Sequence, residues 1–334
     1  MADRAATSVL FGFDFQANAA IVLMLENIRE MAHIRLEGSE DIEITLNDGS
    51  HIFAQAKSVV NSSSDFRNVL SNLKKSIESL SEAYYNTSSS TNVRELIYIT
   101  NSPNPFKEKQ PNAIFLGPSQ RTFSSLPEKL QGKIFDILNG LDNPLDINKF
   151  KIQILPFETD IDRERYKTVI AEIGDFISLL GNVSINRNLI HGIWAKDLFR
   201  SGTRKDKSIN LKKKELIWPI IVLVTNNDDY DEYDIDDSET EELLSSYKDI
   251  INICSEKYEF ITRVLSAYNS FKAEDNKTKL DVFIKSESLN FKYLFDDTNI
   301  SLSEDLQDKL LQIIIRNIIR QRIKINKIKD TVNL

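Results

Sequence analysis

Residues 37–57 of this 334-residue chain decide its fold, and they read EGSEDIEITLNDGSHIFAQAK. Apolar and polar side chains alternate over residues 41–46 and again over 51–57, which is the pattern of half-buried β-strands. Asn47-Asp48-Gly49, between them, has the composition of a hairpin turn. The stretch therefore predicts two adjacent antiparallel strands.

The length of the turn sets which side chains share a face. A two-residue loop at Asp48-Gly49 pairs Asp41 with Ala56, whereas a three-residue loop over 47–49 pairs Asp41 with Gln55, and directly opposed residues lie on one face. The three-residue loop needs a left-handed residue at its end, and glycine adopts that conformation without steric cost. This register also gathers Ile42, Ile44, Ile52 and Ala54 on one apolar face. The polar face then carries Asp41, Glu43, Gln55 and Lys57.

Three of these polar side chains are candidates for catalysis. The Asp41 carboxylate and the Gln55 amide oxygen are hard oxygen ligands that suit Mg²⁺, which takes few protein ligands and keeps several waters. The Lys57 ammonium is a donor that can hold an attacking water or stabilise charge on a phosphate. We therefore predict Asp41, Gln55 and Lys57 as catalytic residues, with Asp41 and Gln55 as the ligands of Mg²⁺ or Mn²⁺.

An acid opening one strand and (E/Q)-x-K on the next resembles the active site of the PD-(D/E)xK nuclease superfamily. Upstream, Gly12-Phe13-Asp14-Phe15-Gln16 opens an apolar helix, and Leu36-Glu37-Gly38 leads to Asp41. Together these motifs resemble one branch, the nuclease domain of bacterial anti-phage effectors of the Lamassu and CBASS types. The resemblance covers roughly residues 8–100.

The resemblance implies an α/β fold with a restriction-endonuclease-like mixed sheet, and it suggests three supporting residues. Gln16 is either a polar residue of the first helical turn or a residue that orients a ligand or water at the site. Glu37 is either a second metal carboxylate or an exposed side chain. Glu43 shares the face of Asp41 but lies two residues further along, so we expect a peripheral carboxylate.

Composition bounds the remaining possibilities. Apolar residues make up 41% of the chain and charged residues 28%, as in ordinary soluble proteins. The single cysteine, Cys254, excludes an internal disulfide and fits a reducing cytoplasm. The longest apolar runs are shorter than the roughly 20 residues of a membrane helix. No zinc signature, glycine-rich phosphate loop or nucleophile–histidine–acid order is present in the sequence.

Charge is unevenly distributed along a chain whose net charge is −8. Residues 228–242 hold ten acidic and no basic residues, and we interpret them as an acidic loop. Two basic clusters are either solvated surfaces or contacts for phosphate or an acidic partner. The first comprises Arg200, Arg204, Lys205, Lys207, Lys212, Lys213 and Lys214. The second comprises Arg316, Arg320, Arg322, Lys324, Lys327 and Lys329.

Beyond the hairpin, the pattern predicts helices over 66–80 and 126–141 and strands over 93–100 and 149–157. We place a nuclease domain at 1–157 and a mostly helical regulatory or partner-docking domain at 158–334. In the second domain helical spacing runs over 160–180, 186–200 and 241–273. Residues 218–224 are a buried strand or short helix, 279–295 contain strand-like runs, and a capping box at 301–304 opens the last helix.

The leading interpretation is a metal-dependent DNA endonuclease that acts as the effector of an anti-phage defence system. By resemblance to the Lamassu type, its second domain docks on an SMC-like ATPase with an accessory subunit. Double-strand cleavage favours a homo-oligomer when active. Two alternatives stay open: a CBASS-type nuclease activated by a nucleotide, and a catalytically inactive nucleic-acid-binding or scaffold module. The −5 charge of residues 1–100 and the glutamine at position 55 favour the inactive module.

Overall fold

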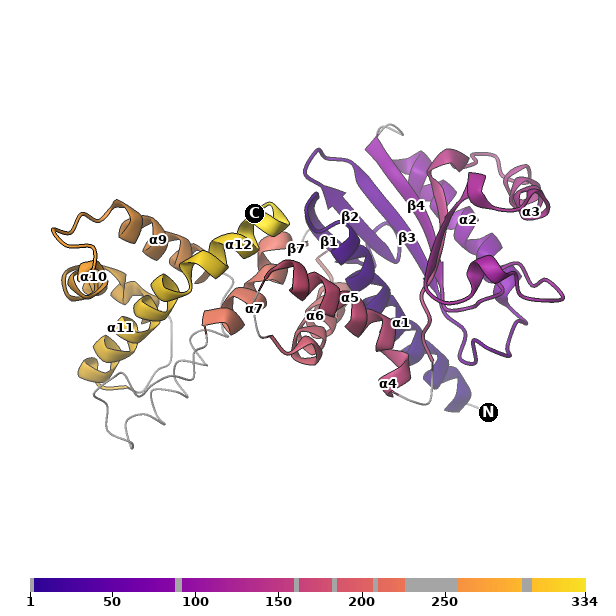
Figure 1. The fold of residues 1–334 in the computed structure, drawn as a ribbon. Helices are drawn as coiled ribbons and strands as arrows, with labels where there is room; N and C mark the ends of the chain where they lie inside the picture. The colour runs from indigo at the N-terminus through magenta and orange to yellow at the C-terminus, as the bar shows by residue number, and fades with distance from the viewer. Residues whose placement is uncertain are drawn as a thin grey trace. The chain divides into compact units, whose positions relative to one another are not determined.

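The computed structural model describes residues 3–87, 92–158, 162–181, 185–206, 210–225, 257–295 and 302–334 (Figure 1). The chain divides into two compact units. The first contains Met1–Phe176 and Arg187–Lys213, and the second contains Ile177–Asn186 and Lys214–Leu334. This division falls later than the boundary predicted at residue 158. The reason is that helix α6 (Arg187–Gly202) packs against the first helix and first strand of the sheet.

A seven-stranded mixed sheet forms the centre of the first unit, with the strand order β5-β6-β4-β3-β2-β1-β7. β3 pairs in parallel with β4, and β4 with β6, whereas the other neighbours are antiparallel. The strands are β1 (Met31–Leu36), β2 (Ile42–Leu46), β3 (His51–Lys57), β4 (Val93–Thr100), β5 (Ser119–Thr122), β6 (Phe150–Ile154) and β7 (Leu211–Lys212). The chain is therefore of the α/β class, as the sequence predicts.

The hairpin of β2 and β3 has the predicted register. Ile42 pairs with Ala54 and Ile44 with Ile52, and the Leu46 amide donates to the Ser50 carbonyl at 2.8 Å. Gly49 closes the turn with φ of 81°, the left-handed conformation that the three-residue loop requires. Continued by one step, this register places Asp41 opposite Gln55.

Helices cover both faces of the sheet. Helix α1 (Asp3–Glu26) contacts β1, β2 and β3, and helix α2 (Val69–Asn86) contacts β3 and β4 (Figure 1). The face predicted to be polar is partly covered by α2, because Phe53 projects from it into an apolar cluster that includes Leu73 and Ile77 of that helix. Helix α3 (Glu128–Leu138) extends that cluster.

Helix α1 is apolar nearly all round, which is expected of a helix enclosed by other elements. Among the described residues, Thr7–Glu26 is the one helical segment long and apolar enough to span a membrane. Every residue from Phe15 to Met24 is buried in the first unit, as in the core helix of a soluble protein. Its apolar character is thus explained by packing.

The described part of the second unit consists of helices and 3₁₀ turns joined by loops, without a strand. Its aromatic core includes Phe260, Phe283 and Phe291, and eight residues of α11 are buried. The remaining elements among the described residues of both units are η2 (Ala113–Phe115), η3 (Phe123–Ser125), η4 (Ile147–Lys149), α4 (Asp162–Arg165), α5 (Lys167–Leu179), α7 (Lys213–Thr225), α9 (Lys257–Ser270), α10 (Lys279–Glu287), η5 (Ser288–Phe295), α11 (Glu304–Arg320) and α12 (Arg322–Val332).

Several local predictions for this unit need correction. The strand-like runs of 279–295 are helical, because Leu280, Phe283 and Ile284 also match helical spacing and their neighbours are helices. Residues 218–224 belong to a helix, which decides between the two predicted options. The N-cap of α11 is Ser303, whose side chain accepts from the Leu306 amide at 3.3 Å, rather than Ser301. The acidic tract 228–242, Cys254 and residues 241–256 of the helix predicted over 241–273 lie outside the described residues, whereas the second half of that prediction is confirmed as helix α9.

Candidate active site

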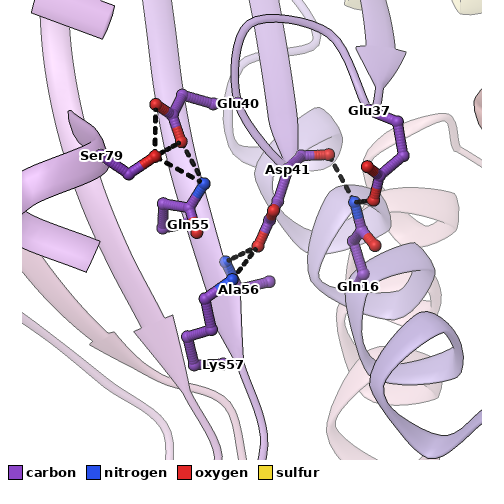
Figure 2. Close-up of polar contacts among 8 residues, drawn as sticks. All are labelled: Gln16, Glu37, Glu40, Asp41, Gln55, Ala56, Lys57 and Ser79. Carbon is purple, nitrogen blue, oxygen red and sulfur yellow. Dashed lines mark hydrogen bonds and ion pairs between the residues drawn. The ribbon is translucent and has the colours of Figure 1, made fainter. Parts of the chain in front are cut away.

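Asp41 and Lys57 meet at the end of the hairpin that is furthest from its turn. Asp41 Oδ2 accepts a hydrogen bond from Lys57 Nζ and another from the Ala56 amide, both at 3.0 Å (Figure 2). The two side chains keep 19% and 33% of their surface exposed, so the pair is reachable from solvent. The carboxylate and the amine that the sequence predicts as catalytic are thus in direct contact.

Gln55 lies beside them but faces inward. Its side-chain nitrogen donates to a carboxylate oxygen of Glu40 and lies 3.4 Å from Ser79 Oγ. With Glu40 ionised, the orientation of the amide follows from these partners, because an ionised carboxylate accepts hydrogen bonds and does not donate them. Its oxygen points away from Glu40 (Figure 2) and accepts no hydrogen bond from any described residue.

Glu40 is the site residue that sequence reasoning missed. It is only 5% exposed, and Ser79 of α2 donates to its carboxylate at 3.0 Å. Burial raises the pKa of Glu40 to about 7, against the opposing effect of hydrogen bonds from Gln55 and Ser79. Strict alternation would place Glu40 on the face opposite Asp41, but it precedes β2 in irregular backbone and turns towards α2. The one sequence feature that points to Glu40 as part of the site is its position directly before Asp41.

Gln16 and Glu37 hold the turn that presents Asp41. The Gln16 side-chain nitrogen donates to Glu37 Oε1 at 2.9 Å and to the Asp41 carbonyl at 2.6 Å. Glu37 has φ of 53°, a left-handed conformation that is uncommon outside glycine, asparagine and aspartate. Gln16 is 5% exposed, so it is a buried brace of the backbone next to the candidate catalytic acid.

Glu43 braces the same turn from the other side. It forms an ion pair with Arg35 at 2.8 Å and accepts from the Ser39 amide at 3.3 Å. A Cβ added to Gly38 would lie 2.6 Å from both the Arg35 guanidinium and the Glu43 carboxylate, so any larger residue here would displace the ends of these two side chains. Glu43 Oε2 takes both of these contacts and Oε1 lies 3.5 Å from His51 Nδ1, as expected for a peripheral carboxylate.

Asn101 links the chain segments that follow the strands near the site. Its side chain exchanges two hydrogen bonds of 2.8 Å with the backbone of Val59 and donates to the Phe157 carbonyl at 2.9 Å. The segments that follow β3 and β6 are thereby joined at the end of β4. Lys57, two residues before Val59, is held on a rigid backbone.

The oxygen atoms present fit a divalent cation that retains water. Among the described residues, no group of three His, Cys, Asp or Glu side chains is arranged to hold a metal ion. Asp41 Oδ2 is occupied by Lys57 and Ala56, whereas no described residue donates to Asp41 Oδ1 or Gln55 Oε1. A carboxylate oxygen and an amide oxygen suit Mg²⁺, which binds through one or two carboxylates and keeps several waters.

The residues of the two predicted basic clusters differ in their exposure and in their contacts. Lys213 is 4% exposed and donates to the Arg29 carbonyl at 2.9 Å, so it is a structural residue and not part of a patch. Arg204, Lys205 and Lys212 are exposed in the first unit. Lys214 belongs to the second unit, where it pairs with Glu259 at 3.4 Å.

The second cluster also makes contacts within its own unit. Arg316 pairs with Asp281 at 2.8 Å, and Arg322 lies 5.7 Å from the ring centre of Tyr268. Arg320 is exposed. Arg316 and Arg322 therefore contact other helices of the second unit, which is neither the solvated surface nor the phosphate or partner contact that the sequence predicts.

Comparison with known proteins adds no family to this description. No protein-family model, no curated protein and no solved structure matches the chain.

Proposed function

We propose that the first unit is a metal-dependent phosphodiester hydrolase of the PD-(D/E)xK kind, acting on DNA. The observation that carries this proposal is the contact between Asp41 and Lys57 across two strands. The Gln55 oxygen, which no described residue engages, lies on the same strand as Lys57. This set of donors and acceptors supplies both a cation site and a cationic group for the reacting phosphate.

Each side chain has a separate task in this scheme. Asp41 and Gln55 would hold Mg²⁺ or Mn²⁺, which when bound polarises the phosphate and activates water. Lys57 stays 3.0 Å from Asp41, where its ammonium can orient a water or stabilise the charge that develops on the phosphate oxygens. Gln16 and Glu43 fix the turn on which Asp41 lies.

The biological setting that we propose is anti-phage defence, with the helical second unit docking on an SMC-like ATPase and its accessory subunit. Support comes from the motif resemblance and from the helical character of the described part of that unit. The alternative of a nucleotide-activated nuclease predicts that a small ligand, and not a protein partner, releases the activity. A homo-oligomeric active form is part of the proposal, because two opposed sites are the usual arrangement for cutting both strands of DNA.

The test is incubation of purified full-length protein with supercoiled plasmid and Mg²⁺, alone and with the products of neighbouring genes. We expect nicked and linear products that disappear with EDTA and with Asp41→Asn. Asp48→Asn, at the exposed tip of the same hairpin, is the matched control and should cleave normally. Plasmid that stays intact under every condition, while the protein still binds DNA, would favour the inactive module.

A further inference from the structure

Three elements that are distant in the sequence place polar groups around one buried amide. Glu40 comes from the connection between β1 and β2, Gln55 from β3 and Ser79 from α2 (Figure 2). Glu40 and Gln55 are 5% and 6% exposed. Two polar side chains so far from solvent need hydrogen-bonding partners, and here each satisfies the other.

The direction of these hydrogen bonds fixes the orientation of the Gln55 amide. Ser79 Oγ lies 3.0 Å from both Glu40 oxygens, so its proton is directed to the carboxylate and its lone pairs are open to Gln55. The Gln55 nitrogen therefore meets two acceptors. With Glu40 ionised, a reversed amide would place its oxygen against the carboxylate, which brings acceptors together without a proton between them.

An amide side chain is a useful metal ligand only when its oxygen faces the cation. A glutamine that is free to rotate presents its NH₂ group in one of its two orientations, and that group repels a metal ion. Groups that orient the ligands of a metal site commonly contribute as much as some of the ligands themselves. Position 55 carries glutamine rather than glutamate, so its orientation matters here in a way that it would not for a symmetric carboxylate.

We propose that Glu40, together with Ser79, is a positioning residue that holds the Gln55 amide with its oxygen towards a divalent cation at Asp41. This inference rests on the proposed metal-dependent function. It adds the specific claim that the cation site depends on a residue which need not touch the cation. Glu40 thereby fixes the direction of the Gln55 oxygen, which a glutamine that can rotate would not keep by itself.

The test measures Mn²⁺ binding to the full-length protein by electron paramagnetic resonance, a readout that does not need nuclease activity. Glu40→Ala should weaken binding by about 10- to 100-fold, the range found for outer groups of metal sites. Glu40→Gln should bind nearly as the wild type, because its amide oxygen still accepts from Gln55. Glu78→Gln, on α2 next to Ser79, is the control and should bind as the wild type.

Two results would overturn the inference in different ways. Wild-type protein that binds Mn²⁺, with Glu40→Ala binding equally well, removes the positioning role and leaves the proposed function intact. Wild-type protein that binds no Mn²⁺, and is indistinguishable from Asp41→Asn, removes both. Should Glu40→Ala fail to fold, the ¹³C resonance of the Gln55 side-chain carbonyl in wild-type protein decides. Mg²⁺ should shift it, and no shift overturns the inference.

Discussion

Replacing Lys57 by methionine should separate catalysis from stability. The substitution removes the ammonium and keeps most of the aliphatic side chain. The ion pair with Asp41 has an Nζ–Oδ2 distance of 3.0 Å, and its side chains are 33% and 19% exposed. For a pair this accessible, the lost free energy of unfolding is about 1 kcal/mol. In a domain of this size that lowers Tm by about 2–4 °C.

The expected effect on the reaction is much larger. A positioned side chain that transfers a proton or stabilises charge contributes about 10²- to 10⁴-fold to a rate. This rate factor corresponds to a change of about 3–5 kcal/mol in the activation free energy of the reaction. The magnitudes therefore predict a folded variant, slightly less stable, whose cleavage rate falls by at least about two orders of magnitude.

The assay follows plasmid cleavage under the condition in which wild-type protein is active, together with thermal unfolding. Lys151→Met is the matched control. Lys151 pairs with Glu95 at 2.6 Å on the same sheet, with side chains 20% and 23% exposed, but lies on β6, away from the Asp41–Lys57 contact. It should show a similar loss of stability and normal cleavage. If Lys57→Met cleaves as fast as Lys151→Met, Lys57 has no role in the chemistry and the proposed site is wrong.

Three further substitutions test the architecture around the site. Gly49→Ala meets no atom within 4 Å, so only its φ of 81° matters, and urea unfolding should show a loss of about 1–2 kcal/mol with the fold retained. Gly38→Ala would displace the ends of Arg35 and Glu43, and we expect weaker Mn²⁺ binding measured by electron paramagnetic resonance because this ion pair would no longer hold the turn before Asp41. Burial lowers the pKa of His191, so the unfolded ring binds a proton more readily and stability should fall as the pH drops below about 6.5. His191→Gln should flatten that decline in unfolding curves recorded across this range of pH.

The sequence predicts the hairpin well because its physical constraints are local. Alternation fixes which side chains share a face, and the left-handed requirement at Gly49 selects the loop length. Together they place Asp41 opposite Gln55 and near Lys57 before any tertiary contact is known. The same reasoning fails for Glu40, because its backbone is irregular and the two-residue period does not apply there.

Other features depend on contacts between distant residues and leave no local signal. Phe53 interrupts the predicted polar face of the hairpin. Its packing in the apolar cluster shows that α2 covers this part of the face. Helix α6 follows the predicted boundary at 158 in the chain but belongs to the first unit through its packing on α1 and β1. Short apolar runs such as 279–295 match both strand and helix periods, and only their helical neighbours decide between them.

The positions of Glu40 and Asp41 explain why this site needs both helical layers. These residues are consecutive, yet Ser79 of α2 contacts the Glu40 side chain at 3.0 Å and Gln16 of α1 contacts the Asp41 carbonyl at 2.6 Å. The side chain of Asp41 is left to face Lys57, between these two sets of contacts (Figure 2). A turn that is held on one side only would let the Asp41 carboxylate move relative to Gln55. Two oxygen ligands from different strands bind a small cation well only when their separation is fixed, so under the proposed function we expect the contacts on both sides to matter as much as the two oxygens themselves.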